Sequence, residues 1–194
     1  QAKAKKIQSF LENGFPSDSW KVHACLGHVR DLKDDESAVD PKDWNNLKWE
    51  STTKGKKTLK EIRELSKDSS GIYLASDPDR EGEAIAWHIL DHLKDKKLIE
   101  GKQIHRISFN EITQSAIKQA VENPRNIDQF LVEAYLARRV LDHLIGFKVS
   151  PLLWRHVPRA KSAGRVQSPT LRMICAREDE IDAFCPEEFW PIKV

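Results

Sequence analysis

Cysteine is scarce in this chain, and the few cysteines lie far apart. Cys25, Cys175 and Cys185 are an odd number of residues, and no two of them form a Cys-x-x-Cys pair. This argues against a disulfide framework and against a zinc site, so we expect reduced thiols. Long apolar runs are also lacking, since no stretch approaches the roughly 18 residues of a membrane span. No signal-peptide pattern opens the chain, and we expect an intracellular protein with no membrane partner.

Acidic residues are missing from one long segment. Residues 143–177 hold seven Lys or Arg and no Asp or Glu, which leaves 25 basic against 30 acidic residues elsewhere, from totals of 32 and 30. The net charge of +2 hides this asymmetry. A cationic segment on a mildly acidic body suggests a polyanionic partner, although a solvated basic face would look the same by charge alone.

The length of 194 residues is enough for one domain with a sizeable core or for two small ones. The first residue is Gln1 rather than Met, which predicts a piece of a longer protein. Hydrophobic residues at 39% and charged residues at 32% are typical of a soluble globular protein.

Helices and strands are predicted to alternate over the first part of the chain. We expect helices over residues 2–12, 59–65 and 84–93, and strands over residues 21–26, 71–75 and 104–109. Residues 33–57, with Trp44 and Trp49 as large anchors, are predicted to be a long excursion with little regular structure. The alternation favours βαβ units with a mainly parallel sheet, whose first strand would lie before Gln1.

From Glu111 onward the strand signals fade. We expect helices over residues 112–121, from an Asp128 cap to about Ile145, and over 169–182. The sequence therefore predicts an α/β domain over residues 1–110, followed by an α-helical domain over 111–194.

The acidic stretch Ser76-Asp77-Pro78-Asp79-Arg80-Glu81-Gly82-Glu83 follows the predicted strand 71–75. In an open α/β sheet, ligands bind at the carboxyl ends of strands. Carboxylates at the alternate positions Asp77, Asp79 and Glu81 converge on one side if the turn stays extended. Mg²⁺ prefers such oxygen ligands and is commonly held by one or two carboxylates plus phosphate oxygens. A helix start with Asp77 as cap and Pro78 in the first turn is the simpler alternative, but it does not explain the remaining acids.

Two other stretches combine basic and small residues. Arg138, Arg139 and Asp142 lie on neighbouring positions of one predicted helix, where an ordinary ion pair is an open alternative. Ser162, Ala163 and Gly164 precede Arg165 at an expected helix start, which would leave backbone N–H groups open to a phosphate.

These stretches together resemble the type IA DNA topoisomerases, and most closely their bacterial topoisomerase I branch. The acidic stretch is similar to the Asp-x-Asp-x-Glu signature of the Toprim domain, which is Rossmann-like with a mainly parallel sheet. Ala137-Arg138-Arg139 with Asp142, Ser162-Ala163-Gly164-Arg165-Val166-Gln167-Ser168 and Gly27-His28-Val29-Arg30-Asp31-Leu32 fit in the family's order. The resemblance spans essentially the whole chain.

The resemblance implies Mg²⁺ bound by Asp77 and Asp79, with Glu81 as a supporting ligand and Arg80 countering local charge. His28 is implied to lie by the active site as a supporting residue. The residues implied to contact single-stranded DNA are His28, Arg138, Arg139, Asp142, Phe147, Trp154, Ser162, Ala163, Gly164, Arg165, Val166 and Gln167. Phe147 replaces the Tyr usual in the family, so only stacking or packing is expected there.

The resemblance implies a monomeric enzyme of the bacterial cytoplasm and nucleoid, or of an organelle if the source is eukaryotic. It relaxes negatively supercoiled DNA through a 5′-phosphotyrosine, strand passage and religation without ATP. The family's catalytic Glu and its Tyr-x-Arg-Thr-Asp-Ser stretch are not found in this sequence, so the chain alone is expected to be inactive. Open alternatives are a Toprim primase or nuclease, a non-catalytic DNA-binding module, topoisomerase III and reverse gyrase.

Overall fold

The structure is a computed structural model that describes residues 2–25, 27–43 and 46–191. It divides into two compact units, Gln1–Val140 and Leu141–Val194. The first unit contains α1 (Ala2–Gly14), β1 (Arg30–Leu32), a 3₁₀ turn η1 (Glu36–Ala38), β2 (Trp49–Ser51), α2 (Thr53–Lys67), β3 (Gly71–Leu74), α3 (Arg80–Asp95), β4 (Gln103–Arg106), α4 (Gln114–Glu122) and most of α5 (Gln129–Leu144). The second contains the end of α5, a π-helix η2 (Ile145–Val149), α6 (Ser150–His156) and α7 (Gln167–Asp182).

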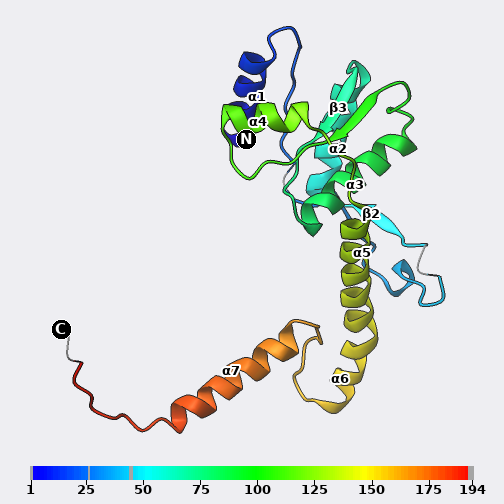
Figure 1. Cartoon of the computed structure of the whole chain (residues 1–194). Coiled ribbons are helices and arrows are strands. Elements are labelled where there is room, and N and C mark those ends of the chain that lie inside the picture. The colour runs from blue at the N-terminus through cyan, green and yellow to red at the C-terminus, as the bar shows by residue number, and fades with distance from the viewer. Residues whose placement is uncertain (1, 26, 44–45, 192–194) are drawn as a thin grey trace. The chain divides into compact units, whose positions relative to one another are not determined.

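The centre of the first unit is the parallel pair β3 and β4, in which Tyr73 lies opposite His105. Side chains alternate across a strand, so Ile72, Leu74 and Ile104 belong to one face and Tyr73 and His105 to the other. The parallel pairing confirms the βαβ prediction for these two strands, which α3 connects (Figure 1).

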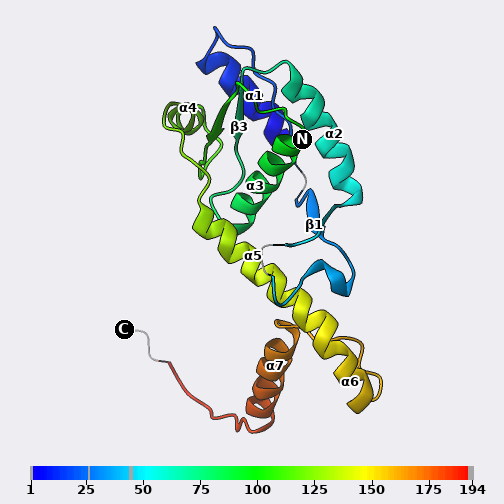
Figure 2. The ribbon, with the colours of Figure 1, turned by 90° about the vertical axis from the view of Figure 1, so that its right-hand side faces the viewer.

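Helices cover both faces of this pair. One core joins Leu59 of α2, Leu74 of β3 and Leu93 of α3, with Ile72 and Ile104 packed against it. The other core joins α1 to α4, which lie side by side in both views (Figures 1 and 2), and includes Tyr73 at its edge. The result is the predicted α/β arrangement, with helical layers on either side of the strands.

The predicted strand over residues 21–26 is wrong for residues 21–25, and Leu26 lies outside the described residues. The alternating pattern has another cause, because Val22 packs against one core and Cys25 against the other. The Val22 N–H donates to the Gln8 side chain at 3.4 Å rather than to a strand. A strand that the pattern did not predict, β1, begins at Arg30 and pairs antiparallel with β2.

The excursion over residues 33–57 has more regular structure than predicted. It contains η1 and β2, and α2 begins at Thr53. The Thr52 hydroxyl caps α2 by accepting from the Gly55 N–H at 2.9 Å. Trp49 serves as an anchor, with its ring 4.5 Å from that of His88, whereas Trp44 lies outside the described residues.

The other predicted elements form with shifted ends. β4 stops at Arg106 rather than residue 109, and α4 begins at Gln114 after its Thr113 cap. Asp128 caps α5 as predicted, because its Oδ1 accepts from the N–H groups of Phe130 at 2.9 Å and Leu131 at 3.2 Å. In the part of the chain that the structure describes, no helix combines the length and apolarity needed to cross a membrane.

Candidate metal and nucleic-acid site

The acidic loop lies between the end of β3 at Leu74 and the start of α3 at Arg80. Asp79, not Asp77, caps this helix, since its Oδ1 accepts from the Gly82 N–H at 2.7 Å. Apolar periodicity predicted that this helix starts at Ala84, but it begins at Arg80. The earlier start is possible because a capped first turn needs no apolar residue. The expected extended turn ends at Asp79, so Glu81 lies in the first helical turn.

Gly82 is required by a close backbone approach. A Cβ atom at this position would lie 2.0 Å from the carbonyl oxygen of Asp77. The Ser76 hydroxyl donates to the Gly82 carbonyl at 2.6 Å, which ties the loop back to the helix. These contacts fix the backbone on which Asp77 and Asp79 are carried.

Arg106, the last residue of β4, holds the same loop through hydrogen bonds. Its Nη2 donates to the Asp77 carbonyl at 2.7 Å and its Nη1 to the Leu74 carbonyl at 3.1 Å. Arg106 Nε also donates to Glu83 Oε1 at 2.9 Å, and neither side chain of this ion pair is exposed. A buried charge is tolerated where it is paired and its remaining hydrogen-bonding atoms are satisfied.

Glu83 also accepts from Arg125 Nη2 at 2.5 Å and from the Asp128 N–H at 3.1 Å. Burial disfavours its ionised form, but the hydrogen bonds from Arg125, Asp128 and Arg106 outweigh burial and lower its pKa. Glu83 thus joins the start of α3, the end of β4 and the start of α5, and its carboxylate is committed to structure rather than to a metal.

The side chains of Asp77, Asp79, Arg80 and Glu81 are all exposed at the carboxyl end of β3. Within the described residues, no three His, Cys, Asp or Glu side chains are arranged so as to hold a metal ion. The two carboxylates of the loop itself, Asp77 and Asp79, remain available, although Asp79 uses Oδ1 for its cap, whereas Glu81 lies in the first helical turn. That number matches the one or two protein carboxylates with which Mg²⁺ is commonly held beside phosphate oxygens.

His28 lies in the loop before β1 and contacts α5. Its ring stacks on Tyr135 with 5.2 Å between centroids, and Tyr135 in turn packs edge-on to His88 at 6.3 Å. His88 is fully buried, and among the residues that the structure describes neither ring nitrogen has a partner. Burial, with repulsion from Arg30 and His28, lowers the pKa of His88 to about 3, so its imidazole is neutral.

Arg139 and Asp31 form a two-pronged ion pair between α5 and β1. Arg139 Nε lies 2.7 Å from Asp31 Oδ1, and Nη2 lies 2.7 Å from Oδ2. This contact joins residues 108 positions apart in the sequence. Arg138, one residue earlier, is exposed.

In the second unit, Asp142 and Arg165 are brought together. Arg165 Nε donates to Asp142 Oδ1 at 2.8 Å. Phe147, in the π-helix, packs on His143 at 4.5 Å between centroids. Trp154 leaves 58% of its surface exposed, while its Nε1 donates to the Lys161 carbonyl at 2.7 Å. The indole face is thus anchored and available for stacking on a base.

The loop before α7 differs from prediction in one respect. The helix begins at Gln167, and the Ala163 N–H donates to the Ser150 hydroxyl at 3.0 Å. This N–H is therefore not open to a phosphate, because buried Ser150 uses it to fasten the loop to α6. Ser162, Val166 and Gln167 remain exposed, and Gly164 is half-buried.

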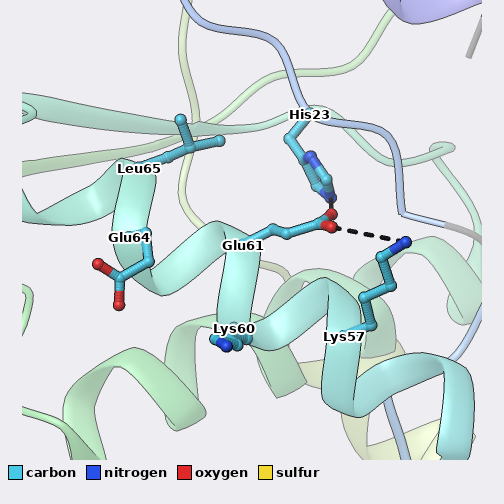
Figure 3. Close-up of a pocket in the computed structure, with 6 residues that line it drawn as sticks. All are labelled: His23, Lys57, Lys60, Glu61, Glu64 and Leu65. Carbon is cyan, nitrogen blue, oxygen red and sulfur yellow. Dashed lines mark ion pairs between the residues drawn. The ribbon is translucent and has the colours of Figure 1, made fainter.

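A pocket of about 540 Å³ lies on α2, away from these residues (Figure 3). Within it, Glu61 forms ion pairs with His23 at 3.4 Å and with Lys57 at 4.0 Å. No residue predicted for the metal or DNA lines this pocket, and it carries none of the chemistry described above.

Comparison with known proteins agrees with this geometry. The Toprim domain family matches residues 1–112, and the DNA topoisomerase family matches residues 126–194. The chain belongs to the Toprim domain family. This confirms the family that the sequence motifs indicated.

Relatives in this family are similar along the whole chain. DNA topoisomerase 1 of Xylella fastidiosa is 50% identical over 98% of this chain, and that of Rickettsia bellii is 47% identical over 100%. The chain spans 23% and 24% of those proteins, about a quarter of their length. The structure of full-length topoisomerase I from Thermotoga maritima matches 96% of this chain and 30% of its own, with TM-score 0.75 and 42% identity.

Several residues that shape this topoisomerase-family site were missed by sequence reasoning. These residues are Asp31, Arg106, Arg125 and Tyr135. Their partners lie far away in the sequence, so no local spacing pattern predicts the contacts. Glu83 offered one signal, because a fourth acid in the loop needed a cation to offset it.

Proposed function

We propose that this chain is the Mg²⁺-binding and DNA-binding N-terminal part of a type IA topoisomerase of the bacterial topoisomerase I branch. The parent protein would relax negatively supercoiled DNA through a transient single-strand break, a 5′-phosphotyrosine, strand passage and ATP-independent religation. The observation that carries this proposal is the pair of exposed carboxylates, Asp77 and Asp79, on a loop fixed by Arg106 and Gly82.

Asp77 and Asp79 are the proposed Mg²⁺ ligands, with Glu81 in support and Arg80 offsetting negative charge. Oxygen donors at the exposed end of a parallel strand suit a hard cation that retains waters and takes phosphate oxygens. The ion would neutralise and orient backbone phosphate. Arg106 and the close backbone contact at Gly82 hold the loop, so that the carboxylates would bind the ion without a rearrangement of the loop.

Each unit contributes residues to the proposed contact with single-stranded DNA. The first contributes His28, Arg138 and Arg139. The second contributes Asp142, Phe147, Trp154 and the loop Ser162, Ala163, Gly164, Arg165, Val166 and Gln167. The arginines, of which Arg138 is exposed, would supply phosphate contacts, and Trp154 would supply a stacking face. We propose a Toprim domain over residues 1–110 and the beginning of a helical DNA-binding domain over 111–194, in a monomeric protein of the bacterial nucleoid.

A labelled single-stranded oligonucleotide tests the DNA part. Affinity should fall steeply with salt, because released counterions supply much of the driving force. Arg138→Gln and Arg165→Gln should each weaken binding by about 1 to 3 kcal/mol, the range for a charge-assisted contact. Lys3→Gln, which removes one exposed charge from α1, is the matched control. Equal affinities for the parent chain and the three variants would show that neither Arg138 nor Arg165 contacts the DNA.

A further inference from the structure

Tyr135 and His28 form a long-range contact that the proposed chemistry does not yet use. Their rings are nearly parallel, with an interplanar angle of 21°. The Tyr135 hydroxyl lies 3.4 Å from Nδ1 of His28, across 107 residues of sequence. Stacking fixes the plane of the imidazole, and the hydroxyl selects one of its two nitrogens.

The direction of this hydrogen bond follows from what surrounds the hydroxyl. Tyr135 is 7% exposed, and its hydroxyl has no other partner in the part of the chain that the structure describes. Burial, with the nearby negative charge of Asp31, raises the pKa of Tyr135 to about 12, so the O–H proton is retained. If His28 were the donor, that buried proton would have no acceptor, which proteins strongly avoid. Tyr135 is therefore the donor and Nδ1 of His28 the acceptor.

The acceptor role of Nδ1 determines the protonation of the other ring nitrogen of His28, Nε2. A neutral imidazole that accepts at Nδ1 carries its proton on Nε2. Nε2 of His28 is not among the buried polar atoms without a partner, and the described residues supply no hydrogen bond to it, so it faces solvent. His28 thus presents an N–H donor outward.

We propose that Tyr135 is a positioning residue, which holds His28 in the Nε2–H tautomer so that this N–H donates to a backbone phosphate oxygen of bound nucleic acid. The proposal rests on the proposed function, since His28 is one of its DNA contacts. Packing of His88 against the edge of Tyr135 keeps the phenol ring in place from the other side. Phenylalanine at position 135 would keep the stacking but would leave both tautomers open.

The first measurement is nuclear magnetic resonance of the ring nitrogens of His28, in protein with ¹⁵N-labelled histidine at neutral pH. The nitrogen shifts should show a proton on Nε2 in the parent chain and a mixture of tautomers in Tyr135→Phe. Tyr73→Phe is the matched control, because Tyr73 also packs on a histidine, His105, at 4.9 Å. It should leave His28 unchanged. An Nε2–H tautomer that persists in Tyr135→Phe would overturn the proposal.

The second measurement is the affinity for a single-stranded oligonucleotide. Tyr135→Phe should weaken binding about two- to tenfold, the effect of one hydrogen bond, and Tyr73→Phe should not. In a His28→Ala background, Tyr135→Phe should have no further effect. A tautomer shift without loss of affinity would overturn the positioning role and leave the proposed function intact. A parent chain that binds no oligonucleotide would overturn the phosphate contact together with the proposed function, whatever the tautomer.

Discussion

Arg139 holds both carboxylate oxygens of Asp31, each at 2.7 Å, and so joins α5 to β1. The two side chains are 37% and 40% exposed, so the pair stabilises the fold only modestly. Its larger expected effect is on the charge available to the proposed DNA partner, because Asp31 offsets the charge of Arg139, one of the two arginines predicted to bind phosphate.

Asp31→Asn should therefore strengthen binding of single-stranded DNA by about two- to fivefold, since it removes the negative charge that lies against the guanidinium of Arg139. The matched control is Asp34→Asn, which makes the same change in net charge at an exposed position nearby. Anisotropy titrations at two salt concentrations measure both. An equal effect of the two variants would mean that Asp31 acts only through net charge.

Asp77→Asn combined with Asp79→Asn should abolish the Mg²⁺ response of the chain. Asn is as good a helix cap as Asp, so the Gly82 N–H keeps its partner and the fold should persist. Calorimetric titration with Mg²⁺ should show weak binding in the parent and none in the variant. Asp18→Asn with Asp34→Asn, both exposed, controls for charge. An unchanged Mg²⁺ titration in the Asp77/Asp79 variant would refute the metal assignment.

Arg106→Met should destabilise the first unit by roughly 3 to 5 kcal/mol, because it leaves the buried Glu83 carboxylate without one of its charged partners. It also removes the donor that holds the Asp77 carbonyl, so Mg²⁺ binding should weaken in the fraction that stays folded. Urea denaturation followed by tryptophan fluorescence gives the free energy of unfolding. Arg63→Met, a half-buried arginine on α2, is the comparison. A loss no larger than in that control would show that Arg106 is not needed to offset Glu83.

Acid should destabilise the fold through His88. Its folded pKa is about 3 and its unfolded pKa about 6.5, so the unfolded state takes up a proton first as the pH falls. Stability is full above about pH 6.5 and is lost progressively toward pH 3, by roughly 2 kcal/mol at pH 5. Glu83, whose folded pKa is lowered, adds to the loss only below its unfolded pKa of about 4.3.

His88→Phe should flatten the stability curve between pH 5 and pH 6.5. The change should remove no hydrogen bond, because both ring nitrogens lack partners within the described part of the chain. The surrounding rings of Trp49, Trp87 and Tyr135 suit an aromatic side chain. Some slope should remain, since burial also lowers the pKa of His92. His156→Gln, at an exposed site, should leave the curve unchanged. Urea midpoints at several pH values provide the curve, and parallel curves for parent and His88→Phe would contradict the prediction.

The sequence predicted those elements whose signal is local. The structure confirms the Asp128 cap, the strand β3 and the apolar faces of α3 and α4. Each of these depends on a sequence pattern only a few residues long. The false strand over residues 21–25 came from a segment lying between two cores, which alternates in burial without pairing.

Contacts that depend on the folded chain were beyond sequence reasoning. The motif marked the acidic loop, but it did not predict that Asp79 would be the cap or that Arg106 and Arg125 would pair with Glu83. Arg139 illustrates the same limit, since a partner 108 residues away leaves no trace in helical spacing. The family resemblance supplied the proposed site residues, and the folded structure supplied their hydrogen bonds.

The chain by itself should neither cleave nor relax DNA. Transesterification needs a nucleophile about 3 to 3.5 Å from phosphorus and in line, which supplies about 7 to 11 kcal/mol of barrier reduction. The sequence holds two tyrosines, Tyr73 and Tyr135. Tyr73 lies within β3 against Trp20, with 5.3 Å between ring centroids, and Tyr135 is buried with its pKa raised to about 12.

Negatively supercoiled plasmid with Mg²⁺ should therefore stay supercoiled, and labelled single-stranded DNA should form no covalent complex with the chain. The Tyr73→Phe/Tyr135→Phe double variant is the control for any trace of linkage. Relaxed topoisomers, or DNA bound covalently through Tyr73 or Tyr135, would contradict the assignment of the nucleophile to a segment that this sequence does not contain. Free cleaved DNA without linkage to protein would instead favour the nuclease alternative, because hydrolysis uses water as the nucleophile and leaves no protein adduct.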